Sequence, residues 1–162
     1  SNGTIAYATA NPTTFIKYNS DNQDWYYTGS SSTDNARWTT SEKDKSIYDP
    51  CPVGWRVPDE GSWSKALGSS SSFTESSLYS STNNGMNFSG RFGSASTIWY
   101  PTSGYRNGKD GSLSDVGSYG YCWSAYPSYN YAYYLLFSYE GRVSPSRGSN
   151  RAGGRSVRCI KD

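Results

Sequence analysis

The clearest alternation of apolar and polar positions lies in the last third of the chain, over Tyr131–Phe137. Successive side chains of a strand point to opposite faces of its sheet, so this pattern predicts a β-strand. We expect one face to be buried and the other to point outward into solvent. The face expected inside carries Tyr133, Leu135 and Phe137, and the face expected outside carries Tyr134, Leu136 and Ser138.

A turn at Glu140-Gly141 is expected to send the chain back antiparallel through residues 142–145. In that returning strand Val143 falls on the inward side, while Arg142 and Ser144 fall on the outward side. Together with the large aromatic residues elsewhere, the inward set predicts the core. The expected core residues are Trp55, Trp63, Trp99, Trp123, Tyr133, Leu135, Phe137 and Val143.

Local signals predict one helix and several shorter strands elsewhere. Asp59 can cap a helix that runs to about Leu67 and ends at Gly68, with Glu60, Trp63 and Leu67 on one face. Asn84-Gly85 and Arg106-Asn107-Gly108 are turn signals. Short strands are expected at 14–17, 54–57, 86–89, 97–100 and 156–160, with residues 1–48 otherwise irregular and anchored by Trp25, Tyr26, Tyr27 and Trp38.

These elements predict a single α+β domain over residues 1–162, with small antiparallel sheets, one or two short helices and much irregular loop. Only 34% of the residues are hydrophobic, and aromatic residues alone account for 17% of the chain, so the core must be rich in Tyr and Trp. The mean hydropathy of −0.78 would suit a disordered chain, but six Trp and sixteen Tyr argue against disorder.

Tyrosines gather in one part of the chain. Eight of the sixteen lie between Tyr119 and Tyr139, and a tail rich in Ser, Gly, Asn and Arg follows to Arg155. These residue types dominate antibody paratopes, because Tyr offers a large contact area at little entropic cost and Ser and Asn offer adaptable hydrogen bonds. The composition of this segment therefore favours binding over catalysis.

Charge and the missing histidine exclude several classes of function. A net charge of +2 is too small to indicate nucleic acid binding, although most charged residues after Asp115 are basic. The chain has no His, which excludes Ser-His-Asp and Cys-His nucleophile systems and removes the commonest metal ligand. No apolar run reaches membrane-spanning length, and Ser1-Asn2-Gly3 is compatible with a signal peptide already removed.

Three cysteines leave one unpaired whatever the pairing. Cys51 and Cys159 lie in stiff, turn-flanked contexts, whereas Cys122 lies inside the tyrosine-rich segment. A disulfide between Cys51 and Cys159 would suit an exported protein, and buried free thiols are the alternative.

Four boxes in this order carry a family resemblance: SIYDPCPVGWRVP (46–58), WYPTSGYR (99–106), GYCWSA (120–125) and SVRC (156–159). With them the chain, over roughly residues 11–162, resembles the Fibrobacter succinogenes major paralogous domain. This resemblance implies a C-type-lectin-like fold, similar to that of formylglycine-generating enzymes. It also implies an exported protein at a cell surface or at a pilus or phage tip in Bacteroidetes-like bacteria, with Cys51 and Cys159 paired.

Some members that this chain resembles are variable proteins of diversity-generating retroelements, which rewrite adenines in the C-terminal coding segment. Such members carry asparagines where this chain has Tyr134, Leu136, Ser138, Arg142, Ser144, Arg147, Gly148 and Ser149. Each of these residue types can be reached from an AAC codon by adenine changes. The resemblance thus implies that about 119–155 is a diversified ligand-binding region, with residues 1–10 a lead-in; ordinary drift on a solvated face is the alternative.

The leading hypothesis is therefore an adhesin or receptor-binding tip that recognises a cell-surface protein or glycan. It predicts one contiguous exposed patch made of Tyr126, Ser128, Tyr129, Asn130, Tyr131, Tyr134, Leu136, Ser138, Tyr139, Arg142, Ser144, Arg147 and Ser149. A glycan-binding module of fixed specificity and a structural subunit without ligand are the alternatives.

We expect no enzymatic activity. Cys122 would lack the second cysteine that formylglycine-generating enzymes need, and the pairs Asp110/Asp115 and Asp59/Glu60 have simpler loop or helix-cap roles. We also expect no cofactor and no metal, since the Glu-Pro-Asn type loops of calcium-dependent lectins are missing from the sequence. The expected domain is monomeric, binds no nucleic acid and does not insert into a membrane.

Overall fold

The computed structural model describes residues 4–18, 24, 26, 37–39, 44–88, 98–128 and 131–162. It is a mixed structure built mostly of small antiparallel sheets, with two short α-helices among the described residues, which agrees with the α+β class. The tryptophan anchor expected at Trp25, the tyrosine anchor at Tyr27 and the predicted site residues Tyr129 and Asn130 lie outside the described residues.

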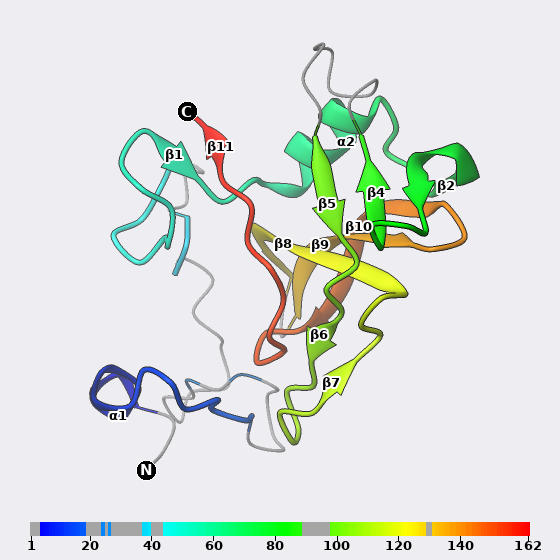
Figure 1. The fold of residues 1–162 in the computed structure, drawn as a ribbon. Helices are drawn as coiled ribbons and strands as arrows, with labels where there is room; N and C mark the ends of the chain where they lie inside the picture. Colours follow the sequence, from blue (N-terminus) through cyan, green and yellow to red (C-terminus); the bar gives the residue numbers. More distant parts are fainter. Residues whose placement is uncertain are drawn as a thin grey trace.

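A four-stranded antiparallel sheet with the order β2-β10-β9-β8 lies at the centre of the molecule (Figure 1). Its strands are β2 (Phe73–Thr74), β8 (Tyr119–Ser128), β9 (Tyr131–Ser138) and β10 (Arg142–Asn150). The predicted turn connects β9 to β10, with Gly141 at φ +78°, and Val143 pairs with Phe137. Glycine suits this turn because a left-handed φ strains residues that have a Cβ.

The remaining strands are short. A three-stranded sheet joins β3 (Tyr79–Ser80), β4 (Gly85–Asn87) and β5 (Trp99–Pro101). β6 (Tyr105–Arg106) pairs with β7 (Leu113–Ser114), and β1 (Trp55–Arg56) pairs with β11 (Ile160–Lys161). Most predicted strands therefore exist with shifted ends, while Ser89 and Thr97, at two predicted ends, lie outside the described residues.

The predicted helix is confirmed as α2 (Glu60–Leu67). The Asp59 carboxylate accepts a hydrogen bond from the Ser62 amide at 2.6 Å, and Gly68 ends the helix at φ +66°. Trp63 and Leu67 are almost fully buried on one helix face, as their spacing predicts. A second helix that the sequence did not suggest, α1 (Ile5–Ala10), begins at Thr4, whose hydroxyl caps the Tyr7 amide.

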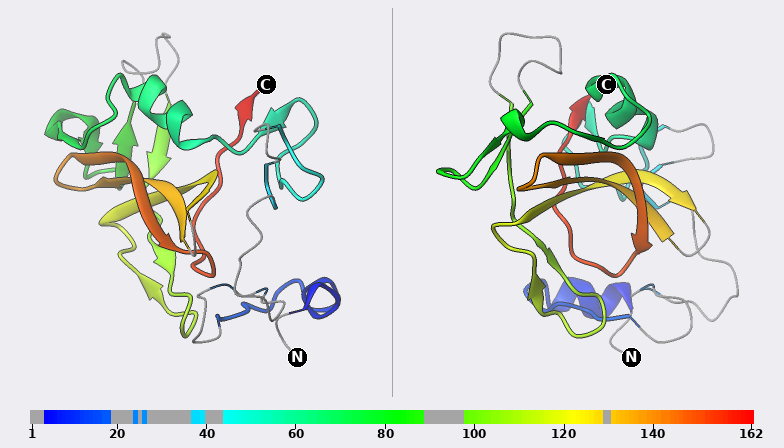
Figure 2. Two further views of the ribbon diagram at one scale, coloured as in Figure 1. Left: turned by 180° about the vertical axis from the view of Figure 1, so that it is seen from behind. Right: turned by 90° about the vertical axis from the view of Figure 1, so that its right-hand side faces the viewer.

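Both faces of the central sheet are covered. α2 and the β3-β4-β5 sheet lie on one side, and β6 and β7 lie on the other (Figure 2). The first side encloses the main core, which includes the predicted residues Trp63, Leu135, Phe137 and Val143 together with Leu67, Met86, Phe88, Tyr100 and Cys122. The second side holds the predicted Trp123 with Tyr121, Tyr134 and Leu136.

Three core predictions need correction. Trp55 is 43% exposed, because β1 is a two-residue edge strand and the chain turns inward only at Val57. Trp99 and Tyr133 are half-buried. The strand expected at 14–17 is also wrong: Thr14 bonds back to Asn11 and Tyr18 to Gly108, so this segment joins no strand ladder.

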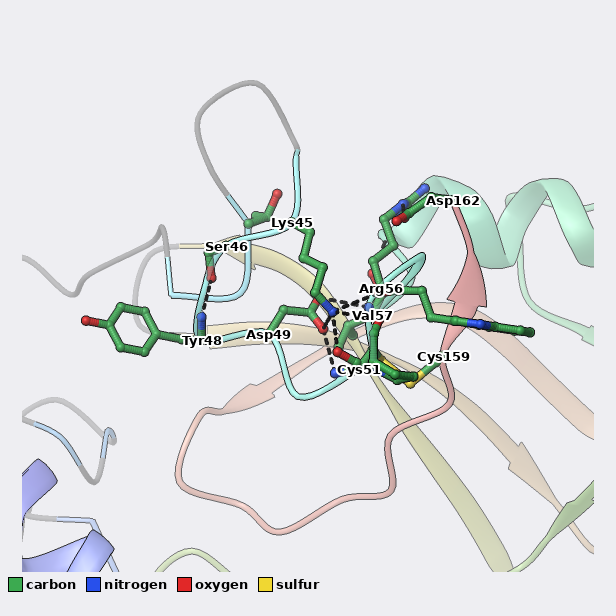
Figure 3. A network of polar contacts seen from close by, with 12 residues as sticks. Lys45, Ser46, Tyr48, Asp49, Cys51, Arg56, Val57, Cys159 and Asp162 are labelled. Atoms are coloured by element: carbon green, nitrogen blue, oxygen red, sulfur yellow. Dashed lines mark hydrogen bonds and ion pairs between the residues drawn. A yellow bond between two sulfur atoms is a disulfide. The ribbon is translucent and has the colours of Figure 1, made fainter.

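The box at 46–58 is held by a partly buried ion pair and a disulfide (Figure 3). Asp49 accepts hydrogen bonds from the amides of Cys51 at 2.8 Å and Val57 at 2.9 Å. The Lys45 ammonium contacts Asp49 at 3.3 Å and donates to three backbone carbonyls, those of Cys51, Pro52 and Trp55. These contacts satisfy the polar groups of a tight loop, so the box is explained by folding.

The disulfide between Cys51 and Cys159 is confirmed, and Cys122 is free and buried. The disulfide joins residues 108 positions apart and fixes the loop before β1 to the segment that leads into β11. The closing hydrogen bond of this region runs from the Asp162 amide to the Gly54 carbonyl at 3.1 Å.

Candidate ligand-binding surface

The residues predicted to form one exposed patch have different environments in the structure. Four of them are buried: Tyr134, Leu136, Ser138 and Ser144. Ser128 and Ser149 are half-buried, and five are exposed, namely Tyr126, Tyr131, Tyr139, Arg142 and Arg147. The prediction of a single exposed patch is therefore wrong.

The four buried residues lie on the face of the central sheet that was expected to face solvent. Tyr134 and Leu136, each 9% exposed, pack with Tyr121 and Trp123 beneath Trp38, Tyr105 and Val157. Ser138 is fully buried, and the Ser144 hydroxyl accepts a hydrogen bond from the Ser72 hydroxyl at 2.8 Å. Side chains from β6 and from distant loops cover this face. The alternation of β9 therefore correctly predicted which residues share a face, but not that the second face is buried.

The five exposed residues fall into two groups at opposite ends of the sheet. Tyr139 and Arg142 flank the turn between β9 and β10, whereas Tyr126, Tyr131 and Arg147 lie toward the other end of the same strands. Tyr131 and Tyr139 are separated by roughly 26 Å along the strand at a rise of about 3.3 Å per residue. The buried middle of β9 lies between the two groups.

At the far end, three tyrosines form what we call the tyrosine surface: Tyr126, Tyr131 and Tyr133. Tyr131 and Tyr133 share the strand face of Leu135 and Phe137, but they lie beyond the part of that face that the main core covers. Tyr126 is 39% exposed and Tyr131 is 45% exposed. The rings of Tyr126 and Tyr133 stack with centroids 6.0 Å apart and planes inclined by 28°, which fixes the orientation of Tyr126.

The neighbouring positions on β10 keep this surface open. Gly148 pairs with Tyr133 and has no side chain, while Asn150 pairs with Tyr131. Arg151 donates a hydrogen bond to the Tyr131 carbonyl at 3.3 Å. The tyrosine surface is thus an exposed aromatic area on strands that are rigidly paired and buried farther along, an arrangement that suits contact with another molecule.

A residue that the sequence did not single out, Arg155, lies on the second face of the sheet. Its guanidinium carbon is 4.4 Å from the centre of the Trp123 ring and 4.5 Å from that of Tyr134, with Tyr105 and Tyr121 slightly farther away. Burial lowers the pKa of Arg155 from its ordinary value, and the neighbouring tyrosines partly oppose this. Guanidinium groups bind aromatic faces well when desolvated. The sequence marked this position only by placing Arg155 directly before the SVRC box at 156–159.

Candidate catalytic groups have structural partners. Asp110 accepts hydrogen bonds from Ser112, which lower its pKa, and Asp115 accepts one from the Tyr121 hydroxyl at 2.5 Å. Burial and this bond to a carboxylate raise the pKa of Tyr121. Asp59 caps α2. Among the described residues no group of three or more Cys, Asp or Glu could hold a metal ion, and no helix is long and apolar enough to cross a membrane.

Cys122 is expected to be unreactive in the native protein. Burial raises the pKa of its thiol to about 12, and Arg158 opposes this only in part. At neutral pH the thiol is therefore protonated as well as enclosed, and a thiolate is the species that reacts with iodoacetamide. Mass mapping of the native, non-reduced protein should show no label on any cysteine after mild treatment, and denaturation should expose Cys122 alone.

Each other outcome of that labelling has a clear meaning. Label on Cys51 or Cys159 in non-reduced protein would contradict the disulfide. Label on native Cys122 at neutral pH would contradict its burial in the main core.

Comparison with known proteins gave no match to a family model, to a curated protein or to a solved structure. The resemblance to the Fibrobacter succinogenes major paralogous domain therefore depends on the four sequence boxes.

Proposed function

We propose that this chain is the ligand-binding domain of an exported, surface-displayed bacterial protein, and that it contacts its ligand through the tyrosine surface. The observation that carries the proposal is the exposure of Tyr126 and Tyr131, with Tyr126 stacked on the half-buried Tyr133, at the end of a sheet that is otherwise buried on both faces. Exposed aromatic side chains held in fixed orientations lose little entropy on binding and dominate many interfaces.

A cell-surface protein or a glycan is the expected ligand. The partly exposed rings of Tyr126 and Tyr131 suit stacking on sugar C–H surfaces as well as packing against a protein. Asn150 pairs with Tyr131 on β10 and can add hydrogen bonds to either kind of ligand. The disulfide supports export, because disulfides persist mainly in oxidising compartments.

Diversification by a retroelement forms part of this proposal for the exposed positions only. Arg142, Arg147 and Gly148 are exposed and Ser149 is half-buried, so exchange at these sites leaves the packing intact. Exchange at Tyr134, Leu136, Ser138 or Ser144 would instead alter a packed interior. The coding DNA and its neighbourhood decide the matter: an adenine-rich near-copy of this segment beside a reverse transcriptase gene supports diversification, and its absence from the complete locus contradicts it.

The binding proposal predicts that Tyr126→Ser/Tyr131→Ser weakens ligand binding at least tenfold and leaves the melting temperature nearly unchanged. Both rings are substantially exposed, so their removal costs little stability, whereas loss of central aromatic contacts at an interface typically costs about 2 kcal/mol or more. The labelled domain is first tested on arrayed glycans and on intact bacterial cells, and the variant is then measured on the targets that bind.

A matched control removes two exposed tyrosines elsewhere. Tyr48 is 63% exposed and Tyr139 is 49% exposed, and Tyr139 lies at the opposite end of β9. Tyr48→Ser/Tyr139→Ser should bind as the unchanged protein does. Loss of binding in this control, with binding retained in the first variant, would move the contact surface to the other end of the sheet and contradict the proposal.

A further inference from the structure

A cavity of about 520 Å³ lies on the second face of the central sheet, opposite the face that carries the tyrosine surface. Its walls come from the ends of β8 and β9, from residues 14–16 and 37–38 of the N-terminal part, and from the 151–157 segment after β10. Apolar side chains form most of its lining, among them Phe15, Ile16, Trp38, Pro127, Ala132 and Val157. Its volume falls within the usual range for small-molecule sites.

Three polar side chains that line this cavity, Arg37, Ser124 and Arg155, have buried hydrogen-bonding groups without partners among the described residues. In Arg37 only Nε lacks a partner, since its Nη1 pairs with Asp24. The Ser124 residue is 1% exposed, and its hydroxyl has no hydrogen-bond partner. The Nε and Nη1 atoms of Arg155 are buried and have no acceptor. Buried polar groups are nearly always satisfied in folded proteins, so several unsatisfied groups at one cavity indicate a missing partner.

In the described part of the chain no carboxylate lies within ion-pair distance of the Arg155 guanidinium. The acidic residue of the lining, Asp24, is paired with Arg37 at 2.9 Å. An unpaired guanidinium in apolar surroundings is costly, and an anion beside it would relieve that cost.

Neighbouring residues hold the Arg155 guanidinium in place. The rings of Trp123 and Tyr134 lie close to it, and its Nη2 donates to the Ser149 hydroxyl at 2.8 Å. Gly153 leaves room for it, because a Cβ at position 153 would lie 2.3 Å from Nη1. A donor fixed in this manner before binding loses little entropy when a ligand arrives.

We propose that this cavity binds a small hydrophobic carboxylic acid, with the carboxylate at Arg155 and Ser124 and a flat apolar body against Phe15 and Trp38. Charge-assisted hydrogen bonds from a guanidinium favour a carboxylate over a neutral amide of the same shape. The apolar lining favours an aromatic or aliphatic body over a sugar, which carries hydroxyls on every side.

The test compares indole-3-acetate with indole-3-acetamide at neutral pH, with binding followed by NMR chemical-shift changes of the isotope-labelled protein. We expect saturable binding of the acid and at least tenfold weaker binding of the amide. Arg155→Gln should abolish the preference for the acid. Equal binding of acid and amide, or no saturable binding of the acid at millimolar concentration, would overturn the proposal.

Two milder variants keep the test decisive if Arg155→Gln folds poorly. Ser124→Ala removes only the unpartnered hydroxyl and should weaken binding of indole-3-acetate severalfold. Gly153→Ala keeps every functional group but displaces Nη1 of Arg155, so it should also weaken binding of indole-3-acetate. Gly148→Ala is the control: a Cβ there meets nothing closer than 3.8 Å, so binding should not change. Unchanged affinity in both Ser124→Ala and Gly153→Ala would contradict the assigned site.

The cavity and the tyrosine surface can be tested separately. Tyr126→Ser/Tyr131→Ser should bind indole-3-acetate as the unchanged protein does, and the Ser124→Ala variant should keep its binding to glycans or cells. Loss of acid binding in the tyrosine variant would contradict a site at Arg155.

Discussion

Phe137→Ala is expected to lower the free energy of unfolding by about 3–5 kcal/mol, the usual cost of emptying a fully buried aromatic position. Phe137 is fully buried in the main core. Its ring makes edge-to-face contacts with Phe88 at 5.7 Å and Tyr100 at 6.0 Å between centroids. Chemical denaturation followed by circular dichroism measures the change.

Gly120 gives this prediction a sharper form. It pairs with Phe137 across β8 and β9, and a Cβ at position 120 would lie 1.9 Å from the Phe137 ring. Gly120→Ala should therefore be strongly destabilising alone, because neither the strand backbone nor the enclosed ring can move away. In the Phe137→Ala background the same change meets empty space, so its cost should nearly vanish.

The double-mutant cycle isolates this contact, because residues in direct contact are expected to show non-additive effects. Gly148→Ala on β10 is the matched control, since it also places a methyl group on a paired strand but in open surroundings. Additive costs of Gly120→Ala and Phe137→Ala would show that the ring does not fill the space over Gly120. A melting temperature scarcely changed by Phe137→Ala would show that the strand faces are inverted.

Local patterns were sufficient to predict α2 and the inward face of β9. The capping carboxylate of Asp59 and the left-handed backbone of Gly68 mark the two ends of the helix. The burial of Leu135 and Phe137 on one strand face follows from the alternation of side chains alone. The disulfide was also predicted, although the spacing of cysteines leaves pairing open and the resemblance was needed to choose it.

The exposure of the second face could not be predicted in this manner. Alternation shows which residues share a face, but the cover over Tyr134 and Leu136 comes from Trp38, Tyr105 and Val157, which are distant in sequence. The same limit applies to Arg155, whose aromatic surroundings come from four separate positions. The candidate site was therefore predicted only at Tyr126, Tyr131 and their neighbours, where the sheet extends beyond its cover.

β8 was not predicted as a strand, although it is the longest one described. Its apolar character is carried by Tyr, Trp and Cys rather than by aliphatic residues, and its pairing with β9 shifts register between Trp123 and Pro127. Such an irregularity breaks the period of two that identifies a strand in a sequence.

Removing the disulfide with Cys51→Ala/Cys159→Ala is expected to lower the free energy of unfolding by about 2–5 kcal/mol. The bond closes 108 positions of chain, so its loss greatly increases the freedom of the unfolded state. The native loop should change little, because Asp49 and Lys45 still hold the backbone at Cys51 and Val57. The circular dichroism spectrum should therefore stay the same while stability falls.

The dependence of unfolding on denaturant distinguishes this mechanism from loss of a native contact. An unfolded chain without the cross-link exposes more surface, so the slope of free energy against denaturant concentration should increase in the double variant. Cys122→Ala is the control: it removes a buried thiol outside the disulfide and should lower stability without changing that slope. A double variant with unchanged slope and a loss below about 1 kcal/mol would show that Asp49, Lys45 and the pairing of β1 with β11 already hold this region together without the disulfide.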